Sequence, residues 1–233
     1  ESDLPPRLKE LWKKASKAAR AQNFDYVEQL VSNIIQQEPA FIDGRRVLRK
    51  AQIQRAAGSK RGFGGKFHAP NLGLLKIKGL IAKDPAGAII ALEDELAKDP
   101  TNKQANSLLY DAAIAADMPD LGAFALQTIA DGNAKDKEAL KRLAKHYMSF
   151  EEPAKALEMF NKVLALDNSD LEAVKGVTDA SARASMIKNK VEQGGMKRDS
   201  DEMRRLEISS RQQLTKDQIE EQLTEWGAKY AED

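Results

Sequence analysis

The sequence predicts an all-α fold built from repeated pairs of helices. Of the 233 residues, 34 are alanine and 24 are leucine, and both residue types lose little conformational freedom in a helix. Three prolines follow one another at intervals of 34 residues, at Pro85, Pro119 and Pro153. A fixed period of this length is typical of stacked helical repeats, in which one unit cannot bury its apolar face alone.

Each 34-residue interval contains signals for two helices joined by a short turn. A proline suits the first turn of a helix, where its missing N–H costs no hydrogen bond. The first helices of the units align through leucines, and the second helices carry a small residue three positions after each proline and end at a short polar residue. These positions are Leu75, Leu109 and Leu143; Ala88, Gly122 and Ala156; and Asp99, Asn133 and Asp167.

The N-terminal part interrupts this register once. Pro39 and Pro100 are 61 residues apart, which is 27 more than one repeat. Residues 42–57 predict a helix, and the glycines of the following segment predict a loop. A second repeat therefore starts and then gives way to an insertion.

The C-terminal part is expected to cap the array. Residues 171–193 predict a last helix, which Gly194 and Gly195 end. Two polar helices are predicted after it, at 201–213 and from a capping box at Thr215 to about Tyr230. The predicted organisation has N-terminal repeat-like helices at 8–57, a basic glycine-rich loop at 58–71, three repeat units at 69–170, and capping and polar helices at 171–233.

The spacing and its residues resemble the tetratricopeptide repeat (TPR) family. The resemblance covers about residues 8–170, with departures at Lys76, where a small packed residue is expected, and at Asn106, where a bulky one is expected. It implies a right-handed superhelix of helix–turn–helix units and a non-enzymatic role in binding other proteins. Residues 137–170 fit best, through Leu140, Leu143, Ala144, Tyr147, Ala156, Phe160 and Val163.

Signals for catalysis or for metal and cofactor binding are absent from the sequence. There is no cysteine, and the two histidines, His68 and His146, lie in no metal-ligand spacing. The glycine-rich loop is not a phosphate-binding motif, because Lys60 replaces a required glycine and Phe67 a required serine or threonine. The sequence therefore predicts no catalytic residues, no metal and no cofactor.

The TPR resemblance implies that the first helices line a concave groove for a peptide or helix of a protein partner. Within it, Lys141 and Lys145 lie one helical turn apart and either bind an acidic group or are simply solvated. Trp12 has a second interpretation too, because its helical spacing with Leu8 and Leu11 fits the core. The candidate groove residues are Trp12, Arg20, Ser107, Asp111, Ile114, Lys141, Lys145 and Met148.

The formal net charge of +1 conceals a strong asymmetry. Residues 1–83 contain 17 basic and 7 acidic residues, and residues 84–233 contain 20 basic and 29 acidic residues. No acidic residue lies between Asp43 and Asp84. The candidate basic patch in this segment, 44–83, consists of Arg45, Arg46, Arg49, Lys50, Lys60, Arg61, Phe63, Lys66, Phe67, Lys76 and Lys78.

Three interpretations of the basic segment compete. It is a solvated face or an intramolecular dock for the acidic half, or it binds an anionic membrane, where each basic residue contributes about 1 kcal/mol. Nucleic-acid binding ranks third, because the RGG-like stretch lacks a stacking platform. The sequence thus predicts a cytoplasmic TPR adaptor with a peripheral membrane contact. The bacterial kinesin light chains, TPR proteins associated with bacterial tubulins, are similar in architecture, which suggests a link between a cytoskeletal assembly and the membrane.

Overall fold

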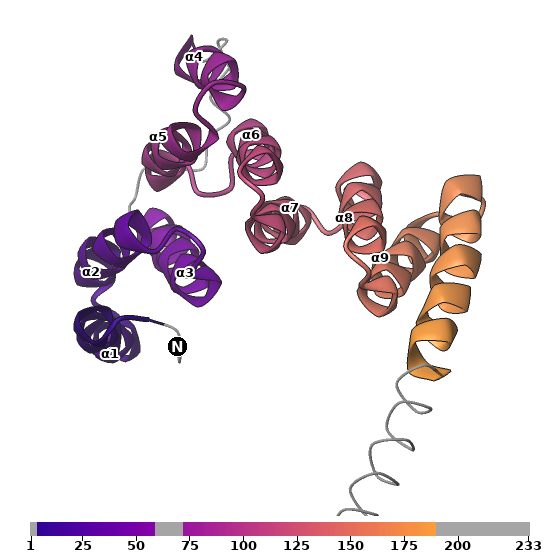
Figure 1. Ribbon diagram of the computed structural model, residues 1–233, viewed down its shortest axis with the longest axis horizontal. Coiled ribbons are helices and arrows are strands. Elements are labelled where there is room, and N and C mark those ends of the chain that lie inside the picture. Colours follow the sequence, from indigo (N-terminus) through magenta and orange to yellow (C-terminus); the bar gives the residue numbers. More distant parts are fainter. Residues whose placement is uncertain (1–3, 59–71, 190–233) are drawn as a thin grey trace, which may run out of the picture. The chain divides into compact units, whose positions relative to one another are not determined.

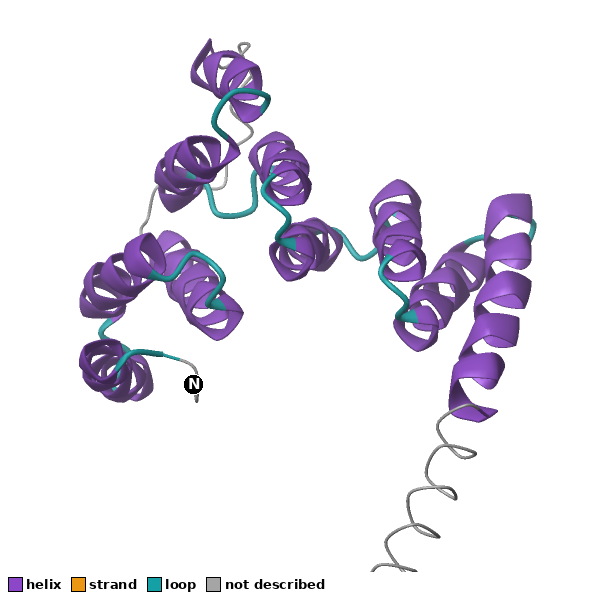
Figure 2. Ribbon diagram, viewed as in Figure 1, coloured by secondary structure: helices purple, strands orange, loops and turns teal. Residues whose placement is uncertain are grey.

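A computed structural model describes residues 4–58 and 72–189, and within these ranges all regular structure is helical (Figures 1 and 2). The chain divides into two units, Glu1–Ala180 and Ser181–Asp233, and the labelled helices all belong to the first. Residues 171–189 form a further helix. The labelled helices are α1 (Pro6–Arg20), α2 (Phe24–Gln37), α3 (Ile42–Gly58), α4 (Leu72–Ile81), α5 (Pro85–Lys98), α6 (Lys103–Ala115), α7 (Pro119–Gly132), α8 (Lys137–Ser149) and α9 (Pro153–Leu166).

The helices pack as consecutive pairs, which confirms the predicted TPR-type architecture. Helix α1 packs against α2, α4 against α5, α6 against α7, and α8 against α9 (Figure 1). The second helices α5, α7 and α9 begin 34 residues apart, each with its proline in the first turn. They end at Asp99, Asn133 and Asp167, as the sequence predicts.

Local hydrogen bonds explain where the first helices begin. The side chain of Asn102 accepts a hydrogen bond from the backbone N–H of Ala105 at 2.9 Å, at the start of α6. Asp136 does the same for Ala139 at 3.1 Å, at the start of α8. Each such cap satisfies one of the N–H groups that a helix leaves without an internal partner.

Small residues allow the two helices of a unit to approach each other closely. Ala88 and Ala156 are fully buried. At Gly122, an added Cβ would lie only 3.2 Å from Ile114 Cδ1, so α6 and α7 leave little room for a side chain there. Buried apolar residues form three clusters, one in α1–α3, one in α4–α7 and one from α7 through α9 to the helix at 171–189.

Both departures from the TPR pattern are accommodated without an apolar side chain. Lys76 lies exposed on α4. Asn106 is fully buried, and its side-chain amide donates hydrogen bonds to the carbonyl oxygens of Pro100 at 3.2 Å and Asn102 at 2.9 Å. The amide therefore ties the start of α6 to the turn before it.

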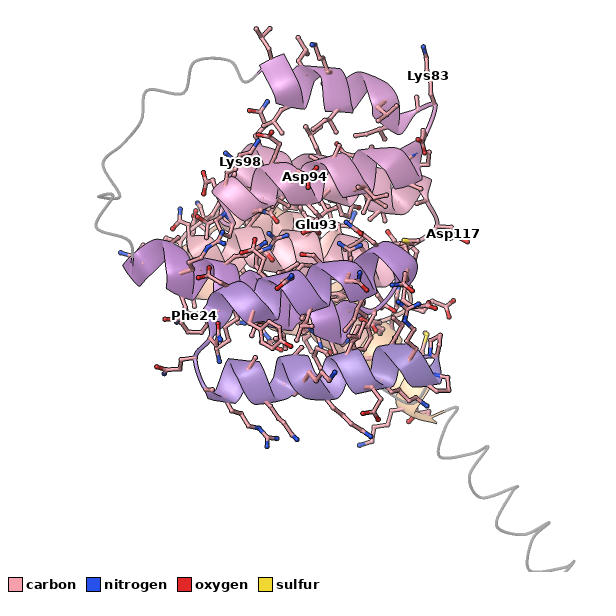
Figure 3. All side chains as sticks on the ribbon, turned by 90° about the vertical axis from the view of Figure 1, so that its left-hand side faces the viewer. Phe24, Lys83, Glu93, Asp94, Lys98 and Asp117 are labelled. Carbon is pink, nitrogen blue, oxygen red and sulfur yellow. The ribbon has the colours of Figure 1, made fainter. Side chains whose placement is uncertain are left out.

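Helix α3 joins the N-terminal helices to the later repeats through buried charge. Arg45 and Arg49 of α3 are 1% and 4% exposed, and both form ion pairs with Glu93 of α5. Figure 3 shows Glu93 between α5 and the α3 region. Burial lowers the pKa of the Arg45 guanidinium, and the charge of Glu93 opposes that shift. Helix α3 also packs against α2, α1 and α7.

The helix at 171–189 packs onto α9 through small residues. Ala173 and Ala180 are fully buried. At Gly176, an added Cβ would lie 2.5 Å from the ring of Phe160. This contact is what a capping helix requires. The predicted loop at 59–71 and the C-terminal helices at 201–213 and 215–230 lie outside the described residues.

The capping residue Asp136 is expected to make stability depend on pH. Hydrogen bonds from Lys103 and from the Ala139 N–H lower its pKa, so the charged form is favoured in the folded state. Its contribution is therefore present above about pH 4 and is lost as the pH falls through the lowered pKa. We expect Asp136→Ala to lower the free energy of unfolding by about 1 kcal/mol at neutral pH. Urea unfolding at several pH values should show this difference shrinking in acid, and a difference that persists unchanged would contradict the expectation.

Candidate protein-binding surface

The first helices α6 and α8 share a surface of mixed character, here called the first-helix surface: Ser107, Asp111, Ile114, Arg142, Lys145 and Met148. Arg142 connects the two helices. Its guanidinium donates a hydrogen bond to Ser107 Oγ at 2.8 Å and lies 3.9 Å from Asp111 Oδ1. It also lies over the ring of Tyr110, 5.3 Å from the centroid. The surface thus brings together the predicted positions Ser107 and Asp111, with an arginine that the TPR resemblance did not mark.

The predicted lysine pair on α8 is already paired with carboxylates of this chain. Lys141 is mostly buried, and its Nζ lies 2.8 Å from Glu138, 2.9 Å from Glu172 and 3.3 Å from Asp170. Hydrogen bonds to these carboxylates, first of all to Glu138, raise the pKa of Lys141. Lys145 also pairs with Glu172. The expectation that the two lysines are available to an acidic ligand is therefore wrong, and they tie α8 to the helix at 171–189.

The N-terminal groove positions separate in the same way. Trp12 is 9% exposed and packs edge-on against Phe41, with ring centroids 4.9 Å apart. It belongs to the α1–α3 core, so its assignment to the groove is wrong. Arg20 is exposed in the last turn of α1.

The candidate basic patch contains two residues that are not surface residues. Arg45 and Arg49 are buried against Glu93, because burial of a guanidinium requires a paired carboxylate. Their assignment to a membrane-contacting patch is therefore wrong. Arg46, Lys50, Lys76 and Lys78 are exposed, as predicted for a surface. Five other members of the patch lie outside the described residues: Lys60, Arg61, Phe63, Lys66 and Phe67.

Helix α4 exposes apolar side chains beside its lysines. Leu72 is 71% exposed and Leu75 is 66% exposed, whereas Leu74 is buried against α5 and α6. Lys76 and Lys78 are exposed in the same two turns. This part of α4 is therefore both apolar and basic on its exposed side.

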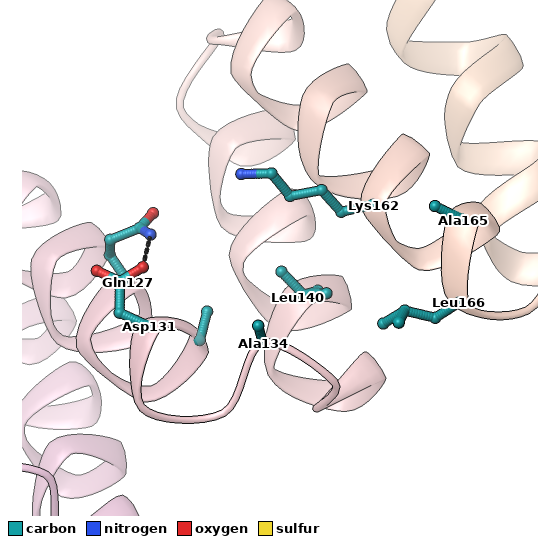
Figure 4. A pocket seen from close by; sticks show the side chains of 8 residues that line it. Gln127, Asp131, Ala134, Leu140, Lys162, Ala165 and Leu166 are labelled. Atoms are coloured by element: carbon teal, nitrogen blue, oxygen red, sulfur yellow. Dashed lines mark hydrogen bonds between the residues drawn. The ribbon is translucent and has the colours of Figure 1, made fainter.

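Two cavities lie along α7, on the side of the second helices. One, of about 410 Å³, is bounded by α7, α8 and α9, and Figure 4 shows its lining with the hydrogen bond from Gln127 to Asp131. The other, of about 510 Å³, lies between α3 and α7 and is here called the α3–α7 cavity. Repeat spacing did not reveal the α3–α7 cavity, because α3 and α7 belong to different units.

Geometry gives no support for catalysis. Within the described ranges, no group of three or more histidine, aspartate or glutamate side chains is placed to hold a metal ion. His146 is buried beside Tyr110 and Phe150, and burial lowers the pKa of its imidazole. His146 is thus a core residue. Among the helices described, none has the length and apolar character to cross a membrane.

Comparison with known proteins finds similarity only at the level of solved structures. No known family profile matches the chain, and no curated protein sequence does. A crystal structure of MamA protein is 17% identical over 79% of this chain and 86% of its own, with a TM-score of 0.38. The first TPR of Spaghetti (RPAP3), bound to an HSP90 peptide, is 16% identical over 52% of this chain and 99% of its own, with a TM-score of 0.39. A tetratricopeptide repeat protein from Parabacteroides merdae is 16% identical over 76% of this chain and 60% of its own, with a TM-score of 0.38. Likenesses of this size do not extend to a function.

Proposed function

We propose that this chain is a non-enzymatic scaffold that binds a protein partner, and that the first-helix surface is a contact for a peptide or helix of that partner. The observation that carries the proposal is the exposed Ile114 beside the Asp111–Arg142 pair. Protein interfaces combine an apolar anchor with a polar rim, and arginine is enriched among their energetic hot spots.

The charges of this surface favour exchange with a partner. The Asp111–Arg142 pair is long at 3.9 Å and about half exposed, so solvent screens it and it contributes little to folding. A partner carboxylate can replace Asp111 against the Arg142 fork, which binds carboxylates in a bidentate manner. Ile114, 38% exposed, offers apolar area within the same helix.

Substitution of Ile114 tests this surface. We expect Ile114→Asp to reduce the amount of partner captured from the source cell at least about tenfold, because a charge replaces the central apolar contact. The matched control is Ile90→Asp, since Ile90 of α5 is also exposed but lies on a second helix. Capture by the full chain followed by quantitative mass spectrometry measures the effect. Equal capture by both variants would contradict the proposed surface.

A second candidate function is contact with an anionic membrane through α4. It is favoured by the exposure of Leu72 and Leu75 beside Lys76 and Lys78. Basic residues near an anionic leaflet contribute about 1 kcal/mol each, and apolar side chains add to this by insertion. The contact with nucleic acid and the link to a cytoskeletal assembly stay predictions from the sequence.

Vesicle sedimentation tests the membrane contact. We expect the full chain to bind vesicles containing phosphatidylserine, and Lys76→Glu with Lys78→Glu to weaken binding about tenfold or more. Leu72→Ser with Leu75→Ser should weaken it as well, whereas Leu171→Ser, at an 83% exposed position away from α4, should not. Binding that is equal with and without phosphatidylserine, or equal in all variants, would exclude this candidate.

A further inference from the structure

We propose that the α3–α7 cavity binds an acidic segment of a protein partner. The inference rests on the proposed role as a protein-binding scaffold, but it concerns a different surface. The first-helix surface lies on α6 and α8, whereas this cavity is bounded by α3 and α7.

One wall of the cavity is basic. Arg46, Arg49 and Lys50 of α3 line it together with Ile53, because residues three, four and seven positions apart share one side of a helix. Arg46 is exposed and has only a long ion pair, 3.5 Å from Asp43. Lys50 is exposed and makes no ion pair with any described residue. Both cations are therefore available to a ligand.

Arg49 provides a buried donor at the same wall. Its two terminal nitrogens are occupied, one by Gln52 Oε1 at 2.8 Å and the other by Glu93 Oε2 at 3.1 Å. Its Nε, in a side chain only 4% exposed, has no hydrogen-bond partner among the described residues. Buried donors are rarely left without an acceptor, and one that lines a cavity points to a ligand oxygen.

The opposite wall favours a peptide over a small ion. Phe124 and Thr128 of α7 line it, with Asp131 as the one carboxylate among the lining residues. Three cations against one carboxylate select for negative charge, while Phe124 and Ile53 offer apolar contact to the rest of the segment. The volume of about 510 Å³ lies in the range of ligand-binding pockets and far exceeds that of one carboxylate group.

The second cavity along α7 extends the site. It shares Gln127 and Asp131 with the α3–α7 cavity, and its lining is mostly apolar, with Ala130, Leu140 and Leu166. A segment crossing α7 would place acidic side chains at the α3 wall and an aliphatic side chain in this second cavity. The occupant is therefore a peptide segment with both glutamate or aspartate and leucine-like residues.

A labelled model peptide tests the proposal on the full chain. We expect the fluorescein-labelled hexapeptide Glu-Glu-Leu-Glu-Glu-Leu to bind, measured by fluorescence anisotropy. Arg46→Glu with Lys50→Glu should weaken binding at least about tenfold, because two attractive charges become repulsive. The matched control, Lys14→Glu with Lys17→Glu, makes the same charge change on the exposed side of α1 and should alter binding less than about twofold. Asp131→Asn should tighten binding about two- to fivefold, since it removes the opposing carboxylate.

Several outcomes would overturn the proposal. Failure of the hexapeptide to bind would do so, as would equal weakening by the two charge-reversal variants, which indicates general charge attraction. Complete competition by inorganic phosphate at similar concentration would assign the site to a free oxyanion, and binding of phosphatidylserine vesicles in place of the peptide would assign it to a membrane. Ile114→Asp separates this site from the first-helix surface, because it should abolish partner capture there and leave hexapeptide binding unchanged.

Discussion

Glu93→Ala is expected to lower the free energy of unfolding by about 3–5 kcal/mol. Glu93 is the shared counter-ion of Arg45 and Arg49, and both guanidiniums are almost fully buried. Removal of the carboxylate leaves two buried positive charges without compensation. Urea denaturation followed by circular dichroism measures the loss.

The neighbouring acid on the same helix is the matched control. Asp94 is exposed on α5, and Figure 3 shows it beside Glu93 in the sequence but on a different side of the helix. Asp94→Ala should change the free energy of unfolding by less than about 0.5 kcal/mol. Similar losses in the two variants would mean that net charge, and not the buried pairing with α3, explains the effect.

Phe160→Ala is expected to cost about 3–5 kcal/mol of unfolding free energy. The ring of Phe160 on α9 is 4% exposed and lies directly against Gly176 of the helix at 171–189. Its deletion removes apolar burial and leaves a cavity where this helix packs. Thermal and urea unfolding measure the loss, and Leu171→Ala, at a position 83% exposed, serves as the control with little expected change.

A double substitution tests the geometry of the same contact. Gly176→Leu alone should destabilise by about 1–3 kcal/mol, because its Cβ would overlap the Phe160 ring. In the Phe160→Ala background the leucine has space, so the two losses should sum to more than the measured double-variant loss. Strict additivity would show that the two residues do not share this contact.

Much of the helical architecture could be predicted because its signals are local. Pro119 begins α7 and Asp136 caps α8 through interactions within four residues, which are readable in the sequence. The small residue at Gly122 also follows from the repeat, since its neighbour Ile114 lies in the same unit.

The candidate site was predicted less well because its charges pair over long distances in the chain. Lys141 looked like a ligand-binding residue, yet Asp170 and Glu172, about one repeat later, neutralise it. Arg142 went unmarked because its partner Ser107 is 35 residues earlier. Repeat spacing gives the position of a side chain on a helix but does not say which charge it meets.

The division between the two kinds of information is clearest in the basic segment. Composition alone establishes that residues 44–83 carry only positive charge, and periodicity establishes that α3 and α4 are helices. Only the tertiary structure separates the buried Arg45 and Arg49 from the exposed Arg46 and Lys50. The physical reason is that burial of a charge depends on a counter-ion brought close by folding, here Glu93 from a helix more than forty residues away.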